Sequence, residues 1–339
     1  MKAYEILSGD GIAGLKLVER DDPVLGPREV RVAIRAVSLN FRDLMVVRGI
    51  YFDPRPDPVV AVSDGAGEVV EVGAEVTRFR VGDRVMTTYF PDWADGPATA
   101  AALHDTYGAQ LDGVLCERFV APETGLVRAP EGLDWAEAAA VPCAAVTAWN
   151  AMFGRGTFGP GNTVLVQGTG GVSVFALQLA AAAGVEAIVT SSSDAKLERA
   201  RELGARAGVN YRSEPDWEQA VLRETGGRGV DVVIEVAGAE TMRQSLDAVR
   251  FGGEVVVIGG LSGFTGANVD PGTLISGNKS LVGVMVGSRA MTEHVARFIE
   301  RKNIRPVVDR VFPFEAAREA YEHLEAGRAF GKVVIGVGG

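Results

Sequence analysis

The order of apolar and polar positions divides the chain into two kinds of segment. The first 120 or so residues hold short runs in which apolar and polar residues alternate, such as EVRVAIRAV, GAGEVVEVGAEV and GDRVMTT, with glycine and proline between them. A period of two is typical of strands with one buried face, and Gly and Pro mark the turns that join them. This part predicts an antiparallel β-rich domain.

From Thr163 the pattern changes to continuous apolar runs between amphipathic ones. The predicted order is strand TVLVQG, helix VSVFALQLAAAAG, strand EAIVTS, helix DAKLERARELGA, strand AGVN, helix PDWEQAVLRETG, strand VDVVIEVA, helix ETMRQSLDAV and strand GEVVVIGG. Such alternation indicates a parallel sheet covered on both faces, and right-handed crossovers make it a doubly wound α/β fold. After Asn278 we expect a strand, SLVGVMVG, two helices and a last strand, KVVIGV.

A glycine-rich turn follows the first apolar strand, in VLVQGTGGVSVFALQLA. Gly168 permits a tight turn, and Gly170 lets backbone N–H groups approach a pyrophosphate at the positive end of the next helix. Such a turn can also simply join two elements, but the strand, the helix and the βαβ repeats around it favour a dinucleotide site. The residues predicted to bind the cofactor there are Gly168, Thr169, Gly170, Gly171 and Val172.

The end of the second strand bears on the choice of cofactor. NAD-binding sequences normally carry Asp or Glu there, whereas this chain has TSSSDAK. The hydroxyls of Ser191 and Ser192 and the ammonium of Lys196 suit a 2′-phosphate, and Tyr211 follows the third strand. The alternative is a serine cap on a solvated helix, with Asp194 disfavouring phosphate. We predict NADP(H).

Composition narrows the class of partner. The 339 residues include 34 Lys and Arg against 44 Asp and Glu, a formal net charge of −10, and no basic cluster is seen, so a nucleic-acid partner is not expected. No apolar run is long enough to span a membrane, and MKAYEILSGDG lacks the apolar core of a signal peptide.

With only two cysteines, a cytoplasmic location is expected. Three histidines and two cysteines, scattered without ligand spacing, make a zinc site improbable.

Several motifs in register carry a family resemblance. GAGEVVEVG, GDRV, VPCAAVTAWNAMF, GTGGVS and the closing GKVVIGV resemble the medium-chain dehydrogenase/reductase superfamily over nearly the whole chain, most closely its zinc-free, quinone-oxidoreductase-like branch. The segment LNFRD is also similar to one in enoyl-reductase domains of polyketide and fatty acid synthases, which reduce carbon–carbon double bonds with NADPH and no metal. The resemblance implies a GroES-like catalytic domain at residues 1–122 and 277–339, and a Rossmann NADP(H)-binding domain at 123–276.

The chain departs from the zinc alcohol dehydrogenases of this superfamily at three places. They carry Cys where this chain has Asn40, and Gly-His-Glu where it has Val62-Ser63-Asp64. Their structural zinc loop needs four cysteines, and residues 91–113 contain none. Neither zinc is therefore expected.

The segment SLNFRDLMVVRG supplies candidates for chemistry. A metal-free hydride enzyme must stabilise developing oxyanion charge with hydrogen-bond donors. Asn40 offers an amide and Tyr51 a phenol, and we name Asn40, Asp43 and Tyr51 as candidate catalytic residues. Asp43 three residues after Asn40 also fits a helix cap, with Gly49 as the stop, and both roles stay open. Arg42 is interpreted as an ion-pair partner of Asp43 or a solvated charge.

Further cofactor contacts are implied by the resemblance. Thr147 would lie against the nicotinamide. Gly260, Leu261 and Val286 would offer backbone groups to its carboxamide. Lys332 lies where the family places a basic pyrophosphate contact, and is otherwise a surface lysine.

We therefore expect an NADPH-dependent, metal-free oxidoreductase that transfers hydride to an activated double bond or a quinone of a small-molecule substrate. A zinc-free alcohol or aldehyde dehydrogenase is the alternative within enzymes, and a low-turnover cofactor-binding structural protein is the alternative outside them. A homodimer is expected, because SLVGVMVG reads as an apolar edge strand that needs covering and the family usually pairs its Rossmann sheets there.

Overall fold

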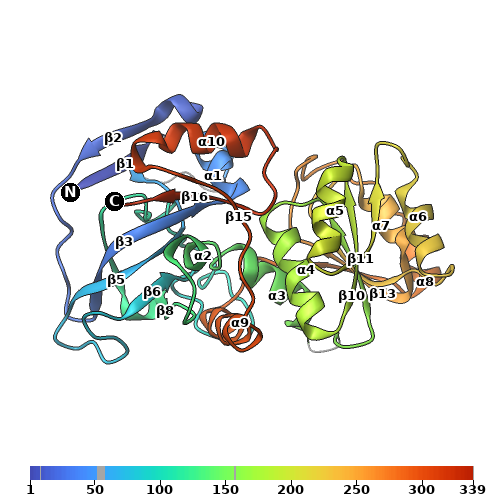
Figure 1. The fold of residues 1–339 in the computed structure, drawn as a ribbon, viewed down its shortest axis with the longest axis horizontal. Helices are drawn as coiled ribbons and strands as arrows, with labels where there is room; N and C mark the ends of the chain where they lie inside the picture. Colours follow the sequence, from blue (N-terminus) through green and yellow to red (C-terminus); the bar gives the residue numbers. More distant parts are fainter. Residues whose placement is uncertain (8, 52–57, 156–157, 339) are drawn as a thin grey trace. The chain divides into compact units, whose positions relative to one another are not determined.

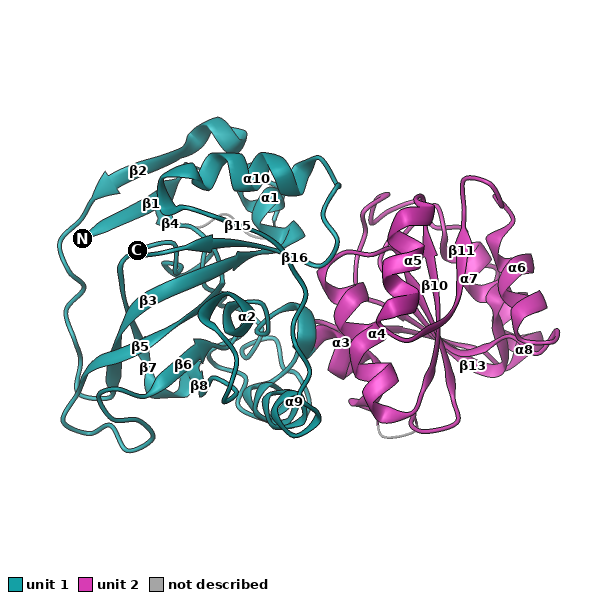
Figure 2. Cartoon of the chain, viewed as in Figure 1, with its two compact units in different colours: residues 1–146, 287–339 teal, residues 147–286 magenta. Residues whose placement is uncertain are grey.

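The computed structural model describes residues 1–7, 9–51, 58–155 and 158–338. They form two compact units, residues 1–146 with 287–339 (unit 1) and residues 147–286 (unit 2) (Figure 2). This division differs from the domain boundaries predicted at 122/123 and 276/277. Unit 1 extends past residue 122 because helix α2 (Trp135–Ala139) packs on its strands β3, β5 and β16.

Unit 1 is built on an antiparallel sheet, as the alternating pattern predicts. Its main sheet has the order β15-β16-β3-β5-β6-β8, with β7 also paired to β3, and a smaller sheet has the order β2-β1-β4 (Figure 1). The pair β15–β16 is parallel, and β15 is a strand that the pattern did not predict. The strands are β1 (Lys2–Ile6), β2 (Leu15–Glu19), β3 (Glu29–Leu39), β4 (Val59–Val60), β5 (Asp64–Val72), β6 (Arg84–Thr87), β7 (Arg118–Pro122), β8 (Leu126–Arg128), β15 (Val308–Phe312) and β16 (Lys332–Gly336).

Strand β3 leads the chain to the candidate site. Its inward residues alternate with more exposed ones up to Arg35, and the last four, Ala36–Leu39, are all buried. Antiparallel pairing places Leu39 at the end of β3 opposite Val333 near the start of β16. The helices of this unit are α1 (Phe41–Val47), α2, α9 (Arg289–Lys302) and α10 (Ala317–Glu325), with short 3₁₀ turns at Gly11–Gly14, Glu123–Gly125 and Phe314–Ala316.

Unit 2 is a doubly wound parallel sheet, which confirms the predicted fold class. Its strand order is β11-β10-β9-β12-β13-β14, and every neighbouring pair is parallel. The strands are β9 (Thr163–Gln167), β10 (Glu186–Ser191), β11 (Ala205–Asn210), β12 (Val230–Glu235), β13 (Val249–Val257) and β14 (Ser280–Gly283). The helices are α4 (Gly171–Ala183), α5 (Asp194–Glu202), α6 (Trp217–Glu224), α7 (Met242–Ala248) and α8 (Pro271–Gly277), and α3 (Ala144–Phe153) contains the division between the units.

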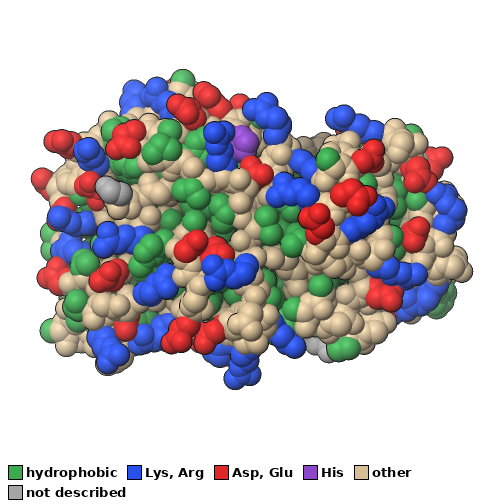
Figure 3. Space-filling view, in the orientation of Figure 1, with side chains coloured by type: hydrophobic (Ala, Val, Ile, Leu, Met, Phe, Trp, Pro, Cys, Tyr) green, Lys and Arg blue, Asp and Glu red, His purple; other side chains and the backbone are tan. Residues whose placement is uncertain are grey.

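The molecular surface carries both signs of charge. On the face drawn in Figure 3, Lys and Arg side chains are interspersed with Asp and Glu side chains. That face therefore lacks the continuous basic stripe that follows a phosphate backbone. Within the described residues, no helix combines the length and the apolar character that a membrane crossing requires.

Asp231 ties together the amino-terminal edge of the unit 2 sheet. Its buried carboxylate accepts hydrogen bonds from Arg228 (2.7 Å), Arg250 (2.6 Å) and the backbone N–H of Thr163 (2.8 Å). Burial raises the pKa of Asp231, but these donors outweigh it and hold the pKa below its usual range. Because the folded-state pKa is depressed, the stabilisation is present above the unfolded-state pKa of about 4 and is lost as the pH falls through the folded-state value.

Asp231→Asn is accordingly expected to lower the free energy of unfolding by about 2 kcal/mol at pH 7, the size of a charge-assisted hydrogen bond. The difference from the wild type should shrink at pH 3. Urea unfolding at both pH values measures it. Asp247→Asn, which removes a surface pair with Arg243, is the control and should change little. An equal destabilisation at pH 3 and pH 7 would contradict the linkage.

Candidate active site

The end of β3 and the start of α1 hold the polar residues of LNFRD. Asn40 stands at the N-cap of α1, and its backbone N–H donates to Asp43 Oδ2 at 2.7 Å. The predicted helix and the predicted capping contact of Asp43 are thus both present. Asp43 is fully buried, and burial raises its pKa while Arg42 and the Asn40 N–H act in the opposite direction.

The side chain of Asn40 meets Lys332, the first residue of β16. Lys332 Nζ donates to Asn40 Oδ1 at 2.5 Å and to the carbonyl oxygen of Leu39 at 2.7 Å. Lys332 is only 3% exposed, so the surface-lysine alternative is wrong. Asn40 Nδ2 is buried and has no hydrogen-bond partner among the described residues. The site therefore contains an amide whose oxygen is engaged and whose N–H donors are not.

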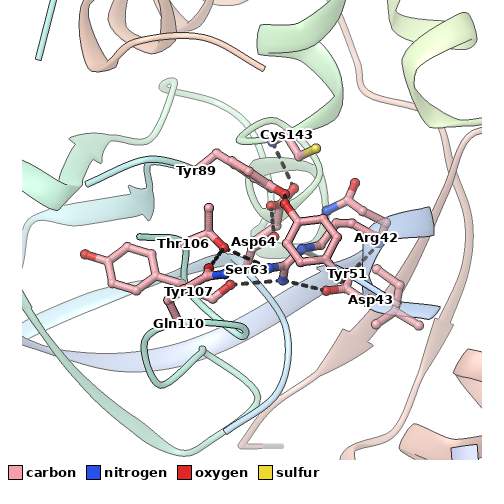
Figure 4. Close-up of polar contacts among 12 residues, drawn as sticks. Arg42, Asp43, Tyr51, Ser63, Asp64, Tyr89, Thr106, Tyr107, Gln110 and Cys143 are labelled. Atoms are coloured by element: carbon pink, nitrogen blue, oxygen red, sulfur yellow. Dashed lines mark hydrogen bonds and ion pairs between the residues drawn. The ribbon is translucent and has the colours of Figure 1, made fainter. Parts of the chain in front are cut away.

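Arg42 is a buried cation rather than a solvated one. Its Nη1 contacts Asp43 Oδ1 at 3.1 Å and donates to the Tyr107 carbonyl at 2.9 Å, and its Nη2 donates to Thr106 Oγ1 at 3.0 Å (Figure 4). Burial acts to lower the pKa of Arg42, but Tyr89, Tyr51 and Asp43 outweigh it and hold the pKa well above its usual range. The predicted ion pair with Asp43 is confirmed, and it lies in the protein interior.

Tyr51 reaches the same cluster and has an unforeseen partner in Tyr89. The two hydroxyl oxygens lie 2.5 Å apart, and the Arg42 guanidinium lies 4.6 Å from the centre of the Tyr51 ring and 5.5 Å from that of Tyr89. Burial raises the pKa of Tyr89 well above its usual range, so this phenol stays protonated at neutral pH. The signal in the sequence was an aromatic pair, YF, just after strand β6, which resembled ordinary packing.

Ser63 and Asp64 stand at the start of β5, and both are fully buried. Asp64 accepts from Ser63 Oγ at 2.7 Å and from the backbone N–H of Cys143 at 2.9 Å. Cys143 is partly exposed, and desolvation, with Asp64 nearby, raises the pKa of its thiol. Across the described residues, no three His, Cys, Asp or Glu side chains form a group that could hold a metal ion.

The chain enters this strand through a strained residue. Val62 is buried with φ of +70°, a conformation that β-branched residues rarely adopt. Two glycines lie against its backbone: a Cβ on Gly108 would come within 2.7 Å of Val62, and one on Gly113 within 2.3 Å of its carbonyl oxygen. The close packing of Gly108 and Gly113 against the Val62 backbone therefore stabilises the turn that presents Ser63 and Asp64.

The predicted phosphate loop joins β9 to α4 in unit 2. Gly168 has φ of +71°, which suits the tight turn, and Gly170 occupies the N-cap of α4. Ser173 Oγ donates to the Gln167 carbonyl at 2.7 Å, so this small residue lets the helix pack closely on the strand. The loop thus has the conformation expected of a pyrophosphate cradle.

The serines at and after the end of β10 have different surroundings. Ser191 is buried and its Oγ accepts from the Ser193 N–H, while Ser193 caps α5 through the Lys196 N–H. The serine-cap alternative is therefore correct for Ser193. Tyr211 is 43% exposed, and its N–H donates to the Ser191 carbonyl, which brings the ends of β10 and β11 together. The roles of Ser191, Ser192, Lys196 and Tyr211 toward a cofactor stay predictions.

The other predicted cofactor residues lie in the first half of α3 and after the last strands of unit 2. Thr147 is buried, Gly260 is buried and Leu261 is exposed. Val286 has φ of +25°, and its carbonyl accepts from Asn150 Nδ2 at 3.0 Å. That carbonyl already has one partner, and the proposed contacts to a nicotinamide stay predictions.

Sequence reasoning missed a buried carboxylate at the end of β12. Glu235 accepts from Gln167 Nε2 (2.8 Å), from the backbone N–H groups of Ala237 and Gly238 (both 2.9 Å) and from Thr241 Oγ1 (2.8 Å). It fixes the loop at the carboxyl edge of the parallel sheet, where ligands bind in open α/β folds. The acidic residue inside the apolar run VDVVIEVA was the available signal.

Comparison with known proteins agrees with this architecture. Residues 26–131 match the alcohol dehydrogenase GroES-like domain and residues 171–301 match the zinc-binding dehydrogenase family. The chain is 44% identical to a zinc-type alcohol dehydrogenase-like protein of Schizosaccharomyces pombe, over 96% of each chain, and 36% identical to a quinone oxidoreductase of Pseudomonas aeruginosa, over 91% of each. A solved structure described as an NAD-dependent alcohol dehydrogenase superposes on this chain with a TM-score of 0.91. The two sequences are 34% identical, and the superposition covers 100% of each chain. The chain belongs to the medium-chain dehydrogenase/reductase superfamily and is an oxidoreductase.

Proposed function

We propose that this protein is a cytoplasmic, NADPH-dependent and metal-free reductase of activated carbon–carbon double bonds or quinones. The observation that carries the proposal is the Asn40 amide, whose oxygen faces the buried ammonium of Lys332. An ammonium at this place repels a divalent cation, so the donor set suits an anion rather than a Lewis acid. Cys116 and Cys143 do not form a disulfide, which is typical of a reducing compartment.

The residues can be given roles in such a reaction. Bound NADPH would supply the hydride, and the loop at residues 168–172 would hold its pyrophosphate. Hydride addition to an enone or quinone leaves negative charge on the substrate oxygen. The Asn40 N–H donors would stabilise that charge, and the Tyr51 hydroxyl, paired with Tyr89, would supply a proton.

The alternative, oxidation of an alcohol without zinc, needs a group that accepts the hydroxyl proton. The two carboxylates of the site already have donors: Asp43 contacts Arg42 and the Asn40 N–H, and Asp64 accepts from Ser63 and Cys143. Neither is placed as an open base, and this favours reduction. A low-turnover cofactor-binding protein would need the loop at residues 168–172, but it would have no use for the Asn40 N–H donors.

The test is cofactor consumption by the purified protein with a crotonyl thioester, a quinone, an aldehyde and a primary alcohol side by side. We expect NADPH oxidation with the first or second, unchanged by a chelator, in protein that holds less than one tenth of a zinc ion per chain. Turnover of the alcohol alone, or a stoichiometric zinc whose removal abolishes activity, would replace this proposal. No turnover with any compound would favour the binding protein.

NADPH is proposed over NADH, although one similar structure is described as NAD-dependent. Lys196→Ala should weaken NADPH binding by about 10- to 100-fold, as expected for a lost charge-assisted contact of about 1.5–3 kcal/mol, and should leave NADH binding unchanged. Nicotinamide fluorescence titrations measure both. Arg201→Ala, on the same helix and paired with Glu198, is the matched control. Equal weakening of both cofactors would exclude the phosphate contact.

A homodimer is proposed through the edge strand β14. The strand is shorter than predicted, ending at Gly283, but it terminates the parallel sheet and carries exposed apolar side chains at Leu281 and, just beyond it, Met285. Such an edge is normally covered. Light scattering at micromolar concentration should give a dimer, and Leu281→Lys should give a monomer, whereas Val24→Lys at an exposed position of unit 1 should not. A monomeric wild type would reject the proposal.

A further inference from the structure

Lys332 and Asn40 are 292 residues apart in the chain and meet because of one strand register. Leu39 pairs with Val333, so the residue before Val333 lies beside the residue after Leu39. Two of the three donors of the Lys332 ammonium are used by the Leu39 carbonyl and Asn40 Oδ1. The lysine is buried, so these protein oxygens take the place of its hydration shell.

This contact decides which way the Asn40 amide faces. An ammonium only donates, so it must meet the amide oxygen, and a rotated amide would bring NH₂ against NH₃⁺. The Nδ2 group is thereby turned away, and it is buried without a partner in the part of the chain that the structure describes. An unsatisfied buried donor is unfavourable, and the charge-assisted contact with Lys332 offsets this cost and holds the amide in its orientation.

The positive charge of Lys332 has a second effect on the Asn40 amide. A hydrogen bond from a cation to the amide oxygen draws electron density from the nitrogen, and this polarises the Nδ2–H bonds. The donor that results is both fixed in direction and stronger than a free asparagine amide. These are the two properties required of a preorganised oxyanion donor.

We infer that Lys332 is a positioning residue, which aims and polarises the Asn40 N–H donors toward the substrate oxygen and affects turnover through Asn40. It thus has a different role from the pyrophosphate contact that the family resemblance implies. The inference rests on the proposed reductase function. The two roles differ in what they predict: a pyrophosphate contact sets cofactor affinity whatever residue 40 is, whereas a positioning residue sets kcat and depends on Asn40.

A double-mutant cycle separates the two roles. Lys332→Met should lower kcat about 10²-fold, the value of one oxyanion donor, and change the dissociation constant of NADPH less than twofold. In an Asn40→Ala background the same substitution should lower kcat less than threefold further. Lys332→Gln keeps a neutral donor for Asn40 Oδ1, and its kcat should be at least tenfold higher than that of Lys332→Met. A weaker NADPH affinity in both backgrounds, with kcat unchanged, would overturn the inference.

A spectroscopic measurement keeps the test independent of turnover. In protein labelled with ¹⁵N-asparagine, the side-chain amide signals of Asn40 are assigned by their loss in Asn40→Asp. Lys332→Met should shift these signals and Lys332→Gln should shift them less, in protein whose thermal midpoint shows that it is folded. Unmoved signals in folded Lys332→Met would refute the contact. If the wild type turns over no substrate, the proposed function fails while the spectra still decide the contact.

Discussion

Asn40→Asp is expected to lower kcat about 10²-fold and to leave the fold intact. One carboxylate oxygen can keep the contact that Lys332 Nζ makes with Asn40 Oδ1, and aspartate is as good an N-cap as asparagine. The substitution nevertheless removes the N–H donors and places negative charge where the substrate oxyanion forms. Loss of a single oxyanion donor typically costs 10²- to 10³-fold in kcat. Steady-state kinetics with the substrate found in the panel, together with the thermal midpoint, measure both effects.

Asp43→Asn is the comparison on the same short helix. Asp43 accepts from the Asn40 N–H and pairs with Arg42, so its amide variant should lower the thermal midpoint more than Asn40→Asp does and affect kcat less. The two variants therefore separate chemistry from capping. If Asn40→Asp turns over at the wild-type rate, Asn40 serves only the fold and the proposed oxyanion site is wrong.

The largest effect on stability is expected for Arg42→Met, about 3–5 kcal/mol in the free energy of unfolding. Methionine fills much of the volume but leaves Asp43 as an uncompensated buried charge, and the Tyr107 carbonyl and Thr106 hydroxyl lose a donor. Urea unfolding of the variant and the wild type at pH 7 measures the difference.

Two further variants define the cause of this loss. Arg28→Met breaks an exposed pair with Glu75 and should change the free energy of unfolding by less than about 1 kcal/mol. Arg42→Met with Asp43→Leu removes both buried charges and should recover a large part of the loss, because a neutral apolar pair carries no desolvation cost. A double variant no more stable than Arg42→Met would show that packing, not the unpaired charge, is responsible.

Local patterns predicted the parts of this molecule that depend on neighbouring residues. The strand and helix order of unit 2 follows from runs of four to thirteen residues, and it is present from β9 to β13. The cap of α1 involves residues three apart, so Asn40 and Asp43 were recognised together. The edge strand β14 was predicted too long, because SLVGVMVG stays apolar after the strand has ended at Gly283.

Contacts between distant segments were beyond such patterns. The family resemblance implied a pyrophosphate contact for Lys332, with an exposed surface lysine as the alternative. Only the pairing of β16 with β3 shows that Lys332 is buried beside Asn40. Tyr89 likewise became part of the site through its hydroxyl contact with Tyr51, 38 residues earlier. A period of two identifies a strand without naming its partner, and the partner strand decides which side chains meet.

The bend at Val62 has a consequence for distant substitutions. The chain adopts a left-handed conformation there with a β-branched residue, in a backbone region that ordinarily favours glycine. Gly108 and Gly113 leave room for the Val62 backbone, so the absence of a side chain is required at these two positions instead. A substitution at either glycine is therefore expected to displace the turn that presents Ser63 and Asp64, although both glycines are distant from them in the sequence.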